Sequence, residues 1–516
     1  MKLGVWLLLV AGAFLGANDA ARILSIFQVP AYSHQSVYRS LMTELAKRGH
    51  EIVHISPFPG LDHPNVTEIS LESSQKIYQD MLNVVEMKQK KYSARETYKL
   101  VMDMTYAVLE AQYNQPEVKK LIAEAAPGVF DLVIFEYFTF IPTIAFGELF
   151  DCPMIGVTSM DTSYVVHEMF GNPSNPVIHP DALFFSFPAP HLSFTQRVYS
   201  LAMQTLWQLY HKPKDDRRVM KILHRHFPNV TANRKKLEDR VALMMVNTNL
   251  NLHPIRPLVP NFIQLGFLHI EPPKTLPNGD IKDFLDASKH GVIYVTFGTS
   301  IRTTDFSPQL RETFLNAFAK LKFDILWKFE SDSIEKPKNV MISKWMPQSD
   351  VLAHPNVKLT LFHGGQQTLE ESIDREVPMV VIPFIEEQKG SARTIVDKKI
   401  GLKLDFHSLN EKVLVKTIHE AMKPEYKKNV QHLKNLVYDQ PETSRERAIW
   451  WTEFTIRNRG CDNLKYAGRD IPFYKEFCLD IFGFLVLICF AIVLIMKKCF
   501  QALQRKLSES DNKKKL

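Results

Sequence analysis

Three short segments in the second half of the chain combine glycines with polar and aromatic side chains. They are Phe297-Gly298-Thr299-Ser300, Trp345-Met346-Pro347-Gln348 and His363-Gly364-Gly365-Gln366-Gln367-Thr368. The third segment places its glycine pair between an apolar strand pattern and a helical pattern. Glycines there let a ligand approach the backbone closely, and a helix start offers unpaired N–H groups at the positive end of its dipole. We therefore expect this turn to bind a diphosphate.

The other two segments matter because they accompany that turn. Trp345 offers a flat face on which a base can stack, and the Gln348 amide can hydrogen-bond a base edge. Taken alone, a tryptophan is more often part of a core, and a His-Gly-Gly turn is weak evidence for a ligand. Together the three segments favour a nucleotide site.

The first half carries a candidate general base at His34, in Tyr32-Ser33-His34. His34 follows the first strand pattern and begins a helix, where the dipole disfavours an imidazolium, so we expect a neutral ring that accepts a proton. Such a base needs an orienting carboxylate. We assign that role to Glu136, which closes the strand pattern Leu132–Glu136, while Asp131 begins that strand, at the wrong end. The alternatives are a capping or surface role for His34 and charge pairing in the core for Glu136.

The elements that must position these residues form two α/β domains. Strand patterns at 23–27 and 51–56 enclose a helix that follows Ser33 and ends at Gly49, which predicts a parallel sheet. Residues 73–125 are mostly helical in pattern. Strands are expected at 132–136, 154–159, 292–297, 323–329, 340–343, 357–362, 378–384 and 401–404, and helices near 308–321 and 443–459.

Prolines between 254 and 277 mark the boundary between the domains, with the linker at 271–280. Two doubly wound domains that face each other form a cleft beyond the carboxyl ends of their strands. The aromatic residues of 181–210 suit core helices, an apolar substrate wall or a face resting on a membrane, and the sequence does not separate these.

The two ends of the chain predict a membrane protein. Lys2 and the apolar run that follows it indicate a signal peptide over 1–20. Residues 477–496 are long and apolar enough to span a bilayer. Lys497 and Lys498 follow at once, so the tail 497–516 is expected in the cytosol and the body in a lumen. Lysines 513 and 514 match an endoplasmic reticulum retrieval signal, and the sequons at Asn65 and Asn229 then become candidate glycan sites.

Composition excludes several classes of protein. Of 516 residues, 45% are hydrophobic and 23% charged, which is typical of a globular chain rather than a disordered one. The net charge of +7 lies mostly in the C-terminal tail, so the nearly neutral body does not suit a nucleic-acid binder. Five cysteines are too few for a disulfide scaffold. No Asp-x-Asp pair lies on a suitable loop, so we expect neither a metal nor another cofactor.

Residues 291–404 resemble the signature region of the family 1 UDP-glycosyltransferases, the UDP-glucuronosyl and UDP-glucosyltransferases. The likeness lies in the spacing of Trp345, Gln348, His363 and Glu371 within the run from VIYVTFGTS to IPFIEEQ. The full layout of leader, two domains, one span and lysine tail resembles the membrane-bound animal branch, and insect enzymes most of all.

The resemblance implies a GT-B fold of two facing Rossmann-like doubly wound domains and a single C-terminal transmembrane helix. It implies a signal peptide at 1–20, an acceptor domain at 21–270, a linker at 271–280, a UDP-sugar domain at 281–460 with C-terminal helices, a span at 477–496 and a tail at 497–516. Trp345 and Gln348 would then bind the base, Glu371 the ribose hydroxyls, and Glu387 and Gln388 the sugar. The diphosphate would contact Thr299, His363, Gly364, Gly365, Gln367 and Thr368.

This chain departs from the commonest family pattern at four places. Gln367 stands where asparagine is usual, Phe362 where a small polar residue is common, and Glu387 and Glu136 where aspartate is common. Gln367 has a longer side chain than the usual asparagine, which puts its role at the phosphates in question. Glu387 in place of the usual aspartate leaves the preferred sugar open.

The implied reaction moves a sugar, glucose first of all, from its UDP carrier to a small lipophilic acceptor. His34, oriented by Glu136, would remove the acceptor proton, and a single displacement would invert the anomeric carbon to give a β-glycoside. The leaving charge would fall to the helix start and His363. A catalytically dead paralogue that binds a hydrophobic ligand and a UDP-sugar hydrolase or phosphorylase are the alternatives. Relatives also suggest a homodimer.

Overall fold

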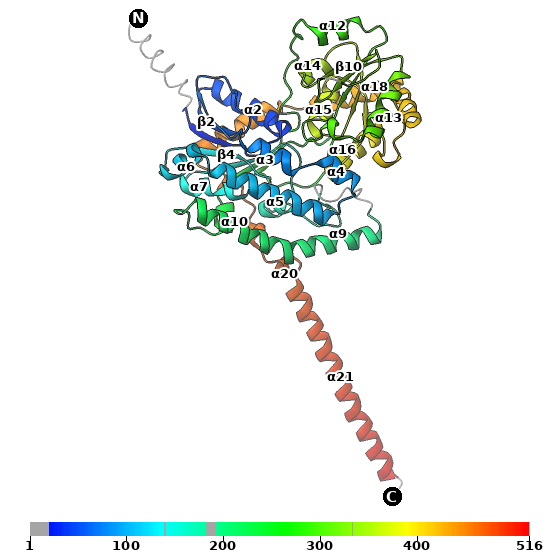
Figure 1. Cartoon of the computed structure of the whole chain (residues 1–516). Helices are drawn as coiled ribbons and strands as arrows, with labels where there is room; N and C mark the ends of the chain where they lie inside the picture. Colours follow the sequence, from blue (N-terminus) through cyan, green and yellow to red (C-terminus); the bar gives the residue numbers. More distant parts are fainter. Residues whose placement is uncertain (1–19, 139–140, 182–191, 333, 515–516) are drawn as a thin grey trace, which may run out of the picture. The chain divides into compact units, whose positions relative to one another are not determined.

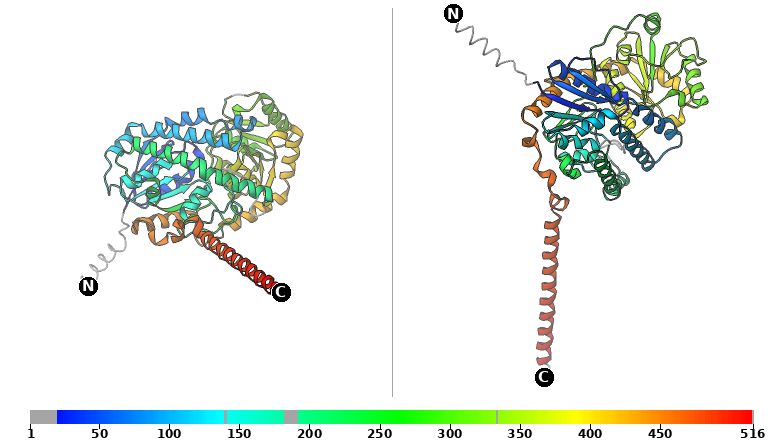
Figure 2. Two further views of the ribbon diagram at one scale, coloured as in Figure 1. Left: turned by 90° about the horizontal axis from the view of Figure 1, so that it is seen from below. Right: turned by 60° about the vertical axis from the view of Figure 1, so that its left-hand side comes forward.

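The computed structural model describes residues 20–138, 141–181, 192–332 and 334–514, so nearly all of the predicted signal peptide lies outside it. The chain divides into two units, one reaching Lys465 and the other running from Tyr466 to Leu516. The first unit holds two α/β lobes, whose ribbons are shown in Figures 1 and 2.

The first lobe is built on a seven-stranded parallel sheet with the order β3-β2-β1-β4-β5-β6-β7. Its strands are β1 Arg22–Ile26, β2 Glu51–Ser56, β3 Val66–Ser70, β4 Leu132–Glu136, β5 Met154–Thr158, β6 Val241–Val246 and β7 Phe262–Gln264. Helices cover a parallel sheet on both faces, and β4, β5 and β6 are accordingly buried along their whole length. The apolar patterns predict β1, β2, β4 and β5 within a residue or so, but they predict no strand at β3, β6 or β7.

Helices of the first lobe connect these strands. They are α2 Tyr32–Lys47, α3 Ser74–Met81, α4 Val84–Gln89, α5 Ala94–Tyr113, α6 Pro116–Ala123, α7 Ala145–Leu149, α8 Tyr164–Phe170, α9 Phe194–Leu206, α10 Lys212–His226 and α11 Arg234–Glu238. Helices α5 and α10 lie side by side, and Arg218 and Arg225 of α10 pair with Asp103 and Glu110 of α5 at 2.8 and 2.6 Å (Figure 1).

The aromatic segment near residue 200 is mostly exposed where the structure describes it. Ser200 is the buried residue of α9, whereas Phe194 and Leu201 face outward. Tyr199 lines the main cavity of the protein. The core interpretation therefore fails for α9, and the phenylalanines at 184, 185 and 187 lie outside the described residues.

The second lobe contains a six-stranded parallel sheet with the order β10-β9-β8-β11-β12-β13. Its strands are β8 Val292–Thr296, β9 Asp324–Lys328, β10 Val340–Ser343, β11 Val357–Phe362, β12 Met379–Val381 and β13 Gly401–Lys403. Its helices are α12 Asp280–Ala287, α13 Pro308–Ala319, α14 Gln348–Leu352, α15 Gln366–Asp374, α16 Glu386–Asp397, α17 Glu411–Ala421 and α18 Pro424–Tyr438. Every strand expected here is present, and β12 ends before Pro383.

Helix α19, Ser444–Arg457, returns to the first lobe. Residues 443–459 were expected to belong to the second domain, but α19 packs against α2 and β6. Ala448 and Ile449 share a core cluster with β1, α2 and β6. A buried helix face follows apolar surface rather than chain order, so the last helix of the body completes the first lobe.

The second unit holds α20, Phe473–Glu476, and the long helix α21, Leu479–Lys514. Residues 479–508 of α21 are long and apolar enough to cross a membrane, with a mean hydropathy of 2.9 in the most apolar stretch. Lys513 and Lys514 of the lysine tail belong to α21, while 515–516 lie outside the described residues.

The two sheets place the predicted residues by the same rule. Strand order reverses between β1 and β4 in the first sheet and between β8 and β11 in the second. A crevice opens beyond the carboxyl ends of strands at such a reversal. Glu136 ends β4 and His34 follows β1, while Gly298 follows β8 and His363 follows β11.

Candidate active site

A cavity of about 1020 Å³ lies between the two lobes and receives side chains from both. His34 lines it from the first lobe. The sequence-predicted residues of the second lobe that line it are Thr299, Trp345, Gln348, His363, Gly365, Gln367, Thr368, Glu371, Glu387 and Gln388. One cavity therefore brings together the base candidate and nearly all the candidate donor ligands.

His34 contacts Glu136 directly. The His34 ring nitrogen Nδ1 lies 2.5 Å from Oε1 of Glu136, and the two side chains are 12% and 1% exposed. Since a carboxylate accepts, Nδ1 carries the hydrogen and the other ring nitrogen, Nε2, is left to accept a proton. The hydroxyl of Tyr38, one helical turn after His34, donates to the same oxygen at 2.8 Å. Sequence reasoning missed Tyr38, although its i+4 spacing from His34 is a usable signal.

The pKa of His34 is raised, which is opposite to the direction expected from its place at a helix start. Burial alone lowers this pKa, but the charge of Glu136 and its hydrogen bond outweigh burial. A full charge 2.5 Å away acts more strongly than the partial charge of a helix end.

Asp131, at the other end of the same strand, has a structural partner. Its carboxylate accepts from the backbone N–H of Arg22 at 2.8 Å and so ties the starts of β1 and β4 together. It does not line the cavity. Glu136 does not line it either, and what distinguishes Glu136 from Asp131 is its direct contact with His34.

The glycine turn of the second lobe is packed around the buried His363 ring. A Cβ atom at Gly298 would lie 2.7 Å from ring atom Cε1, and one at Gly365 would lie 2.6 Å from Nε2. Gly364 adopts a φ of 99°, which L side chains rarely reach. The backbone can approach His363 and a ligand beside it only because these positions lack side chains.

The buried His363 ring is neutral, so the role at the leaving group that we expect for it is that of a hydrogen-bond donor. Burial, and then the charge of Lys328, lower its pKa to about 3. Lys328 is buried, lines the same cavity, donates to the Gly298 carbonyl at 2.8 Å and pairs with Glu330 at 2.9 Å. It is a buried cation that sequence reasoning missed, and its position at the end of β9 was the available signal.

Trp345 keeps an open surface toward the cavity. Its side chain is 53% exposed and its ring meets Tyr32 of the first lobe edge-on, with centroids 4.9 Å apart. A large aromatic surface left uncovered in a nucleotide-sized cavity suits stacking of a base.

Gln348, Thr368 and Glu371 form one polar cluster next to Trp345. The Gln348 amide donates to the Thr368 hydroxyl at 3.0 Å and to Glu371, and accepts from Tyr294 at 3.1 Å. Burial raises the pKa of Glu371 to about 7, although the Gln348 bond works against this. The cluster can accept and donate to a ribose and a base, and Tyr294 is a member that sequence reasoning did not find.

Glu387 and Gln388 begin helix α16 on the same cavity wall. Burial raises the pKa of Glu387, and the charge of His34 acts against that, which places the two groups within electrostatic reach. The Gln388 side-chain oxygen accepts from the backbone of Phe384 at 2.8 Å. Gln388 thus caps its own helix with its side-chain oxygen.

The two sequons differ in accessibility. Asn229 is exposed at the end of α10. Asn65 is half-buried and its amide nitrogen, the atom that a glycan would take, donates to the Ala46 carbonyl at 3.1 Å. Within the part of the chain that the structure describes, no cluster of three His, Cys, Asp or Glu side chains is arranged around a metal.

Comparison with known proteins agrees with this architecture. Residues 21–514 match the family described as UDP-glucoronosyl and UDP-glucosyl transferase. UDP-glucosyltransferase 2 of Dactylopius coccus is 28% identical, covering 100% of this chain and 99% of its own. The ecdysteroid UDP-glucosyltransferase of Mamestra brassicae nuclear polyhedrosis virus is 31% identical over 86% of both chains.

Solved structures share the fold at low identity. The spinosyn forosaminyltransferase SpnP aligns with a TM-score of 0.57 at 15% identity, covering 85% of this chain and 99% of its own. The calicheamicin glycosyltransferase CalG4 aligns with a TM-score of 0.53 at 17% identity over 85% and 99%. Both are two-lobed GT-B glycosyltransferases. With a cleft that joins two such lobes and a family match across nearly its whole length, the chain is a GT-B enzyme that belongs to the UDP-glucuronosyl and UDP-glucosyl transferase family.

Proposed function

We propose that this enzyme transfers glucose from UDP-glucose to a small lipophilic acceptor, with His34 as general base. The observation that carries the proposal is that His34, held by the buried Glu136 behind it, lines the same cavity as the His363 turn. Several relatives across the chain are named as UDP-glucosyltransferases, which favours glucose as the sugar.

The donor would lie along the second lobe. Trp345 stacks on the base, Glu371 accepts from the ribose hydroxyls, and the turn at His363 receives the diphosphate. Because His363 is neutral, it contributes a hydrogen bond, and positive charge comes from the α15 start and Lys328. Glu387, on the wall that faces His34, would accept from a sugar hydroxyl. No metal is required by this arrangement, and EDTA should leave the rate unchanged.

The acceptor would enter from the first lobe. Cavity residues there are largely apolar and include Met87, Met102, Met104, Tyr98 and Phe138. Nε2 of His34 removes the hydroxyl proton as the acceptor oxygen bonds to the anomeric carbon and the bond to UDP breaks. Glu136 then pairs with the imidazolium. A single displacement inverts the carbon and gives a β-glycoside.

The proposal also gives the enzyme a location. Helix α21 anchors it to the endoplasmic reticulum membrane as a type I protein, with the body in the lumen and the lysine tail in the cytosol. In the lumen Asn229, which is exposed, would accept a glycan more readily than Asn65, whose amide is engaged. A homodimer stays part of the proposal and is tested by cross-linking.

The decisive experiment compares His34→Ala with the unchanged chain in membranes. We expect a loss of transfer of about a thousandfold while UDP binding is retained, because the base acts only in the chemical step. Turnover that survives the substitution would remove His34 as the base. Screening UDP-sugars against phenols and sterols identifies the substrates, and release of free sugar without an acceptor would indicate the hydrolase instead.

A further inference from the structure

Helix α15 carries polar side chains on two faces. Thr368 and Glu371 point to the cluster with Gln348 described above. Gln367 and Glu370 share the spacing of three residues and therefore lie on another face, about 100° around the helix. That second face meets the first lobe.

The first lobe offers two residues at the carboxyl edge of its sheet. Ser159 follows β5 and Asn247 follows β6, and these strands are paired in parallel at Thr158 and Val246. The backbone N–H of Asn247 donates to the Thr158 carbonyl at 3.1 Å, so the two strand ends lie next to each other. Their polar groups emerge where the sheet ends and α15 begins.

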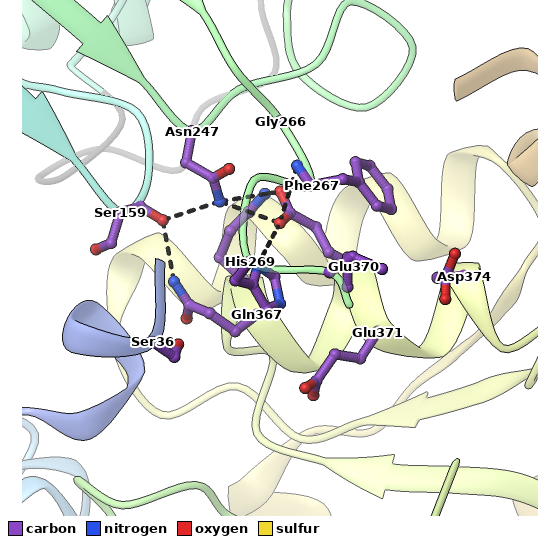
Figure 3. Close-up of polar contacts among 12 residues, drawn as sticks. Ser36, Ser159, Asn247, Gly266, Phe267, His269, Gln367, Glu370, Glu371 and Asp374 are labelled. Atoms are coloured by element: carbon purple, nitrogen blue, oxygen red, sulfur yellow. Dashed lines mark hydrogen bonds and ion pairs between the residues drawn. The ribbon is translucent and has the colours of Figure 1, made fainter. Parts of the chain in front are cut away.

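The residues that join the lobes there include Ser159, Asn247, Gln367 and Glu370. We call these four residues the interlobe contact (Figure 3). The Asn247 amide donates to both carboxylate oxygens of Glu370, at 3.1 and 3.0 Å, and to the Ser159 carbonyl at 3.2 Å. The Gln367 amide donates to the same Ser159 carbonyl at 3.0 Å.

Glu370 is 0% exposed and receives two further donors. The backbone N–H of Phe267 donates to it at 3.3 Å, and the amide of Gln366 at 2.7 Å. Nδ1 of His269 lies 3.4 Å away. Burying a carboxyl is costly unless donors surround it, and burial raises the pKa of Glu370 to about 8. Most of the donors that satisfy Glu370 lie outside α15. Their hydrogen bonds therefore fix the position of this helix.

Neither Asn247 nor Glu370 lines the cavity, so neither is placed to touch the substrates. Yet Glu370 adjoins Glu371 and lies within two turns of the diphosphate turn. We propose that Glu370 is a positioning residue: through Asn247 it anchors α15 to the first lobe and so sets the affinity of the second lobe for the UDP-sugar. This inference rests on the donor site proposed above.

The test measures UDP affinity of the purified full chain in detergent by isothermal titration calorimetry. Glu370→Leu and Asn247→Leu should each raise the Kd for UDP about tenfold, because each leaves a buried polar group without its partner and frees α15. The double variant should bind no more weakly than either single variant, because all three break one contact. The donor KM should rise in parallel, while kcat at saturating donor changes little.

Two matched variants separate positioning from loss of stability. Asp374→Leu alters a buried carboxyl on the same helix whose partners, Tyr438 and Arg375, belong to the second lobe, so it should lower the melting temperature without changing UDP affinity. Glu370→Gln keeps an oxygen for Asn247 and Phe267 and should return the Kd to within about twofold of the unchanged chain.

Each outcome decides the inference. Folded Glu370→Leu and Asn247→Leu chains that bind UDP normally would overturn it, as would an equal loss of affinity in Asp374→Leu. If Glu370→Leu does not fold, Asn247→Leu decides from the other lobe. An unchanged chain that fails to bind UDP would overturn the proposed function, and this inference with it.

Discussion

The two walls of the cavity each bury a histidine, and the two histidines have opposite pKa shifts. His34 lies beside Glu136 and its pKa is raised, whereas His363 lies near Lys328 and its pKa falls to about 3. Both rings are desolvated, so burial alone would lower both values. The charge beside each ring, Glu136 at His34 and Lys328 near His363, accounts for the difference. Glu136 therefore favours a proton on the first ring, whereas burial and Lys328 disfavour one on the second.

The largest effect is expected when the His34–Glu136 pair on the first wall is broken. Glu136→Gln should lower kcat by about a hundredfold or more, because the imidazolium that forms loses its carboxylate. The kcat profile of the unchanged chain should rise with pH through the raised pKa of His34, since only the unprotonated ring acts as base. In Glu136→Gln this rise should move to lower pH.

Asp131→Asn is the matched control for that substitution, because it alters a carboxyl at the far end of the same strand. It should leave both kcat and its pH profile in place. If the pH profile of Glu136→Gln matches that of the unchanged chain, Glu136 does not raise the pKa of His34.

Removal of the open aromatic surface on the second wall should have the next largest effect. Trp345→Ala should raise the donor KM by about tenfold or more with little change in kcat, because stacking on a base contributes about 1–3 kcal/mol. Trp450, a half-exposed tryptophan of α19, gives the control Trp450→Ala. Steady-state kinetics with varied UDP-sugar measures both, and an equal effect of the two variants would argue against stacking.

Replacing Lys328, the buried cation of the second wall, with a neutral residue tests whether its charge lowers the pKa of His363. Lys328→Met should raise the pKa of His363, since its charge lowers that pKa, and should weaken UDP binding by about tenfold. Lys344→Met removes a lysine that pairs with Asp332 on the surface and should change neither. Calorimetry with UDP gives the affinities, and NMR titration of the ring gives the pKa. Normal UDP binding by Lys328→Met would leave the helix start as the source of positive charge.

The smallest expected effect is a pH dependence at Glu371. Its pKa of about 7 means that the carboxyl holds a proton below neutral pH and accepts ribose hydroxyls fully only when ionised. The donor KM should therefore fall severalfold between about pH 6 and pH 8. In Glu371→Gln the donor KM should be higher and nearly independent of pH across that range. A KM in the unchanged chain that does not vary with pH would contradict the raised pKa.

Much of the site follows from local patterns. Strands at 132–136, 340–343 and 357–362 were placed to the residue, because buried parallel strands have continuous apolar runs. Once the strands are known, the residues that follow them must gather at one edge of each sheet. The two lobes and the glycine turn after β11 were predictable for the same reason.

Other features had no local signal. Strand β3 is half-exposed and polar, and β7 has three residues among prolines, so neither stands out from its surroundings. Helix α19 is only weakly amphipathic, and its sequence does not say which lobe its buried face covers. Glu370 reads as one of two adjacent acidic residues, and only its contact with Asn247, 123 positions away, shows why it is buried.

The sequence by itself determined which residue types lie at the strand ends and hence the kind of ligand that the cleft takes. The tertiary structure decided their charge states and their partners: Tyr38 and Glu136 beside His34, Lys328 beside His363, and Asn247 against Glu370. The physical reason is the distance along the chain over which each kind of interaction acts. Backbone periodicity is set by neighbours within a few residues, whereas desolvation and Coulomb interaction depend on distances between atoms that only folding brings together.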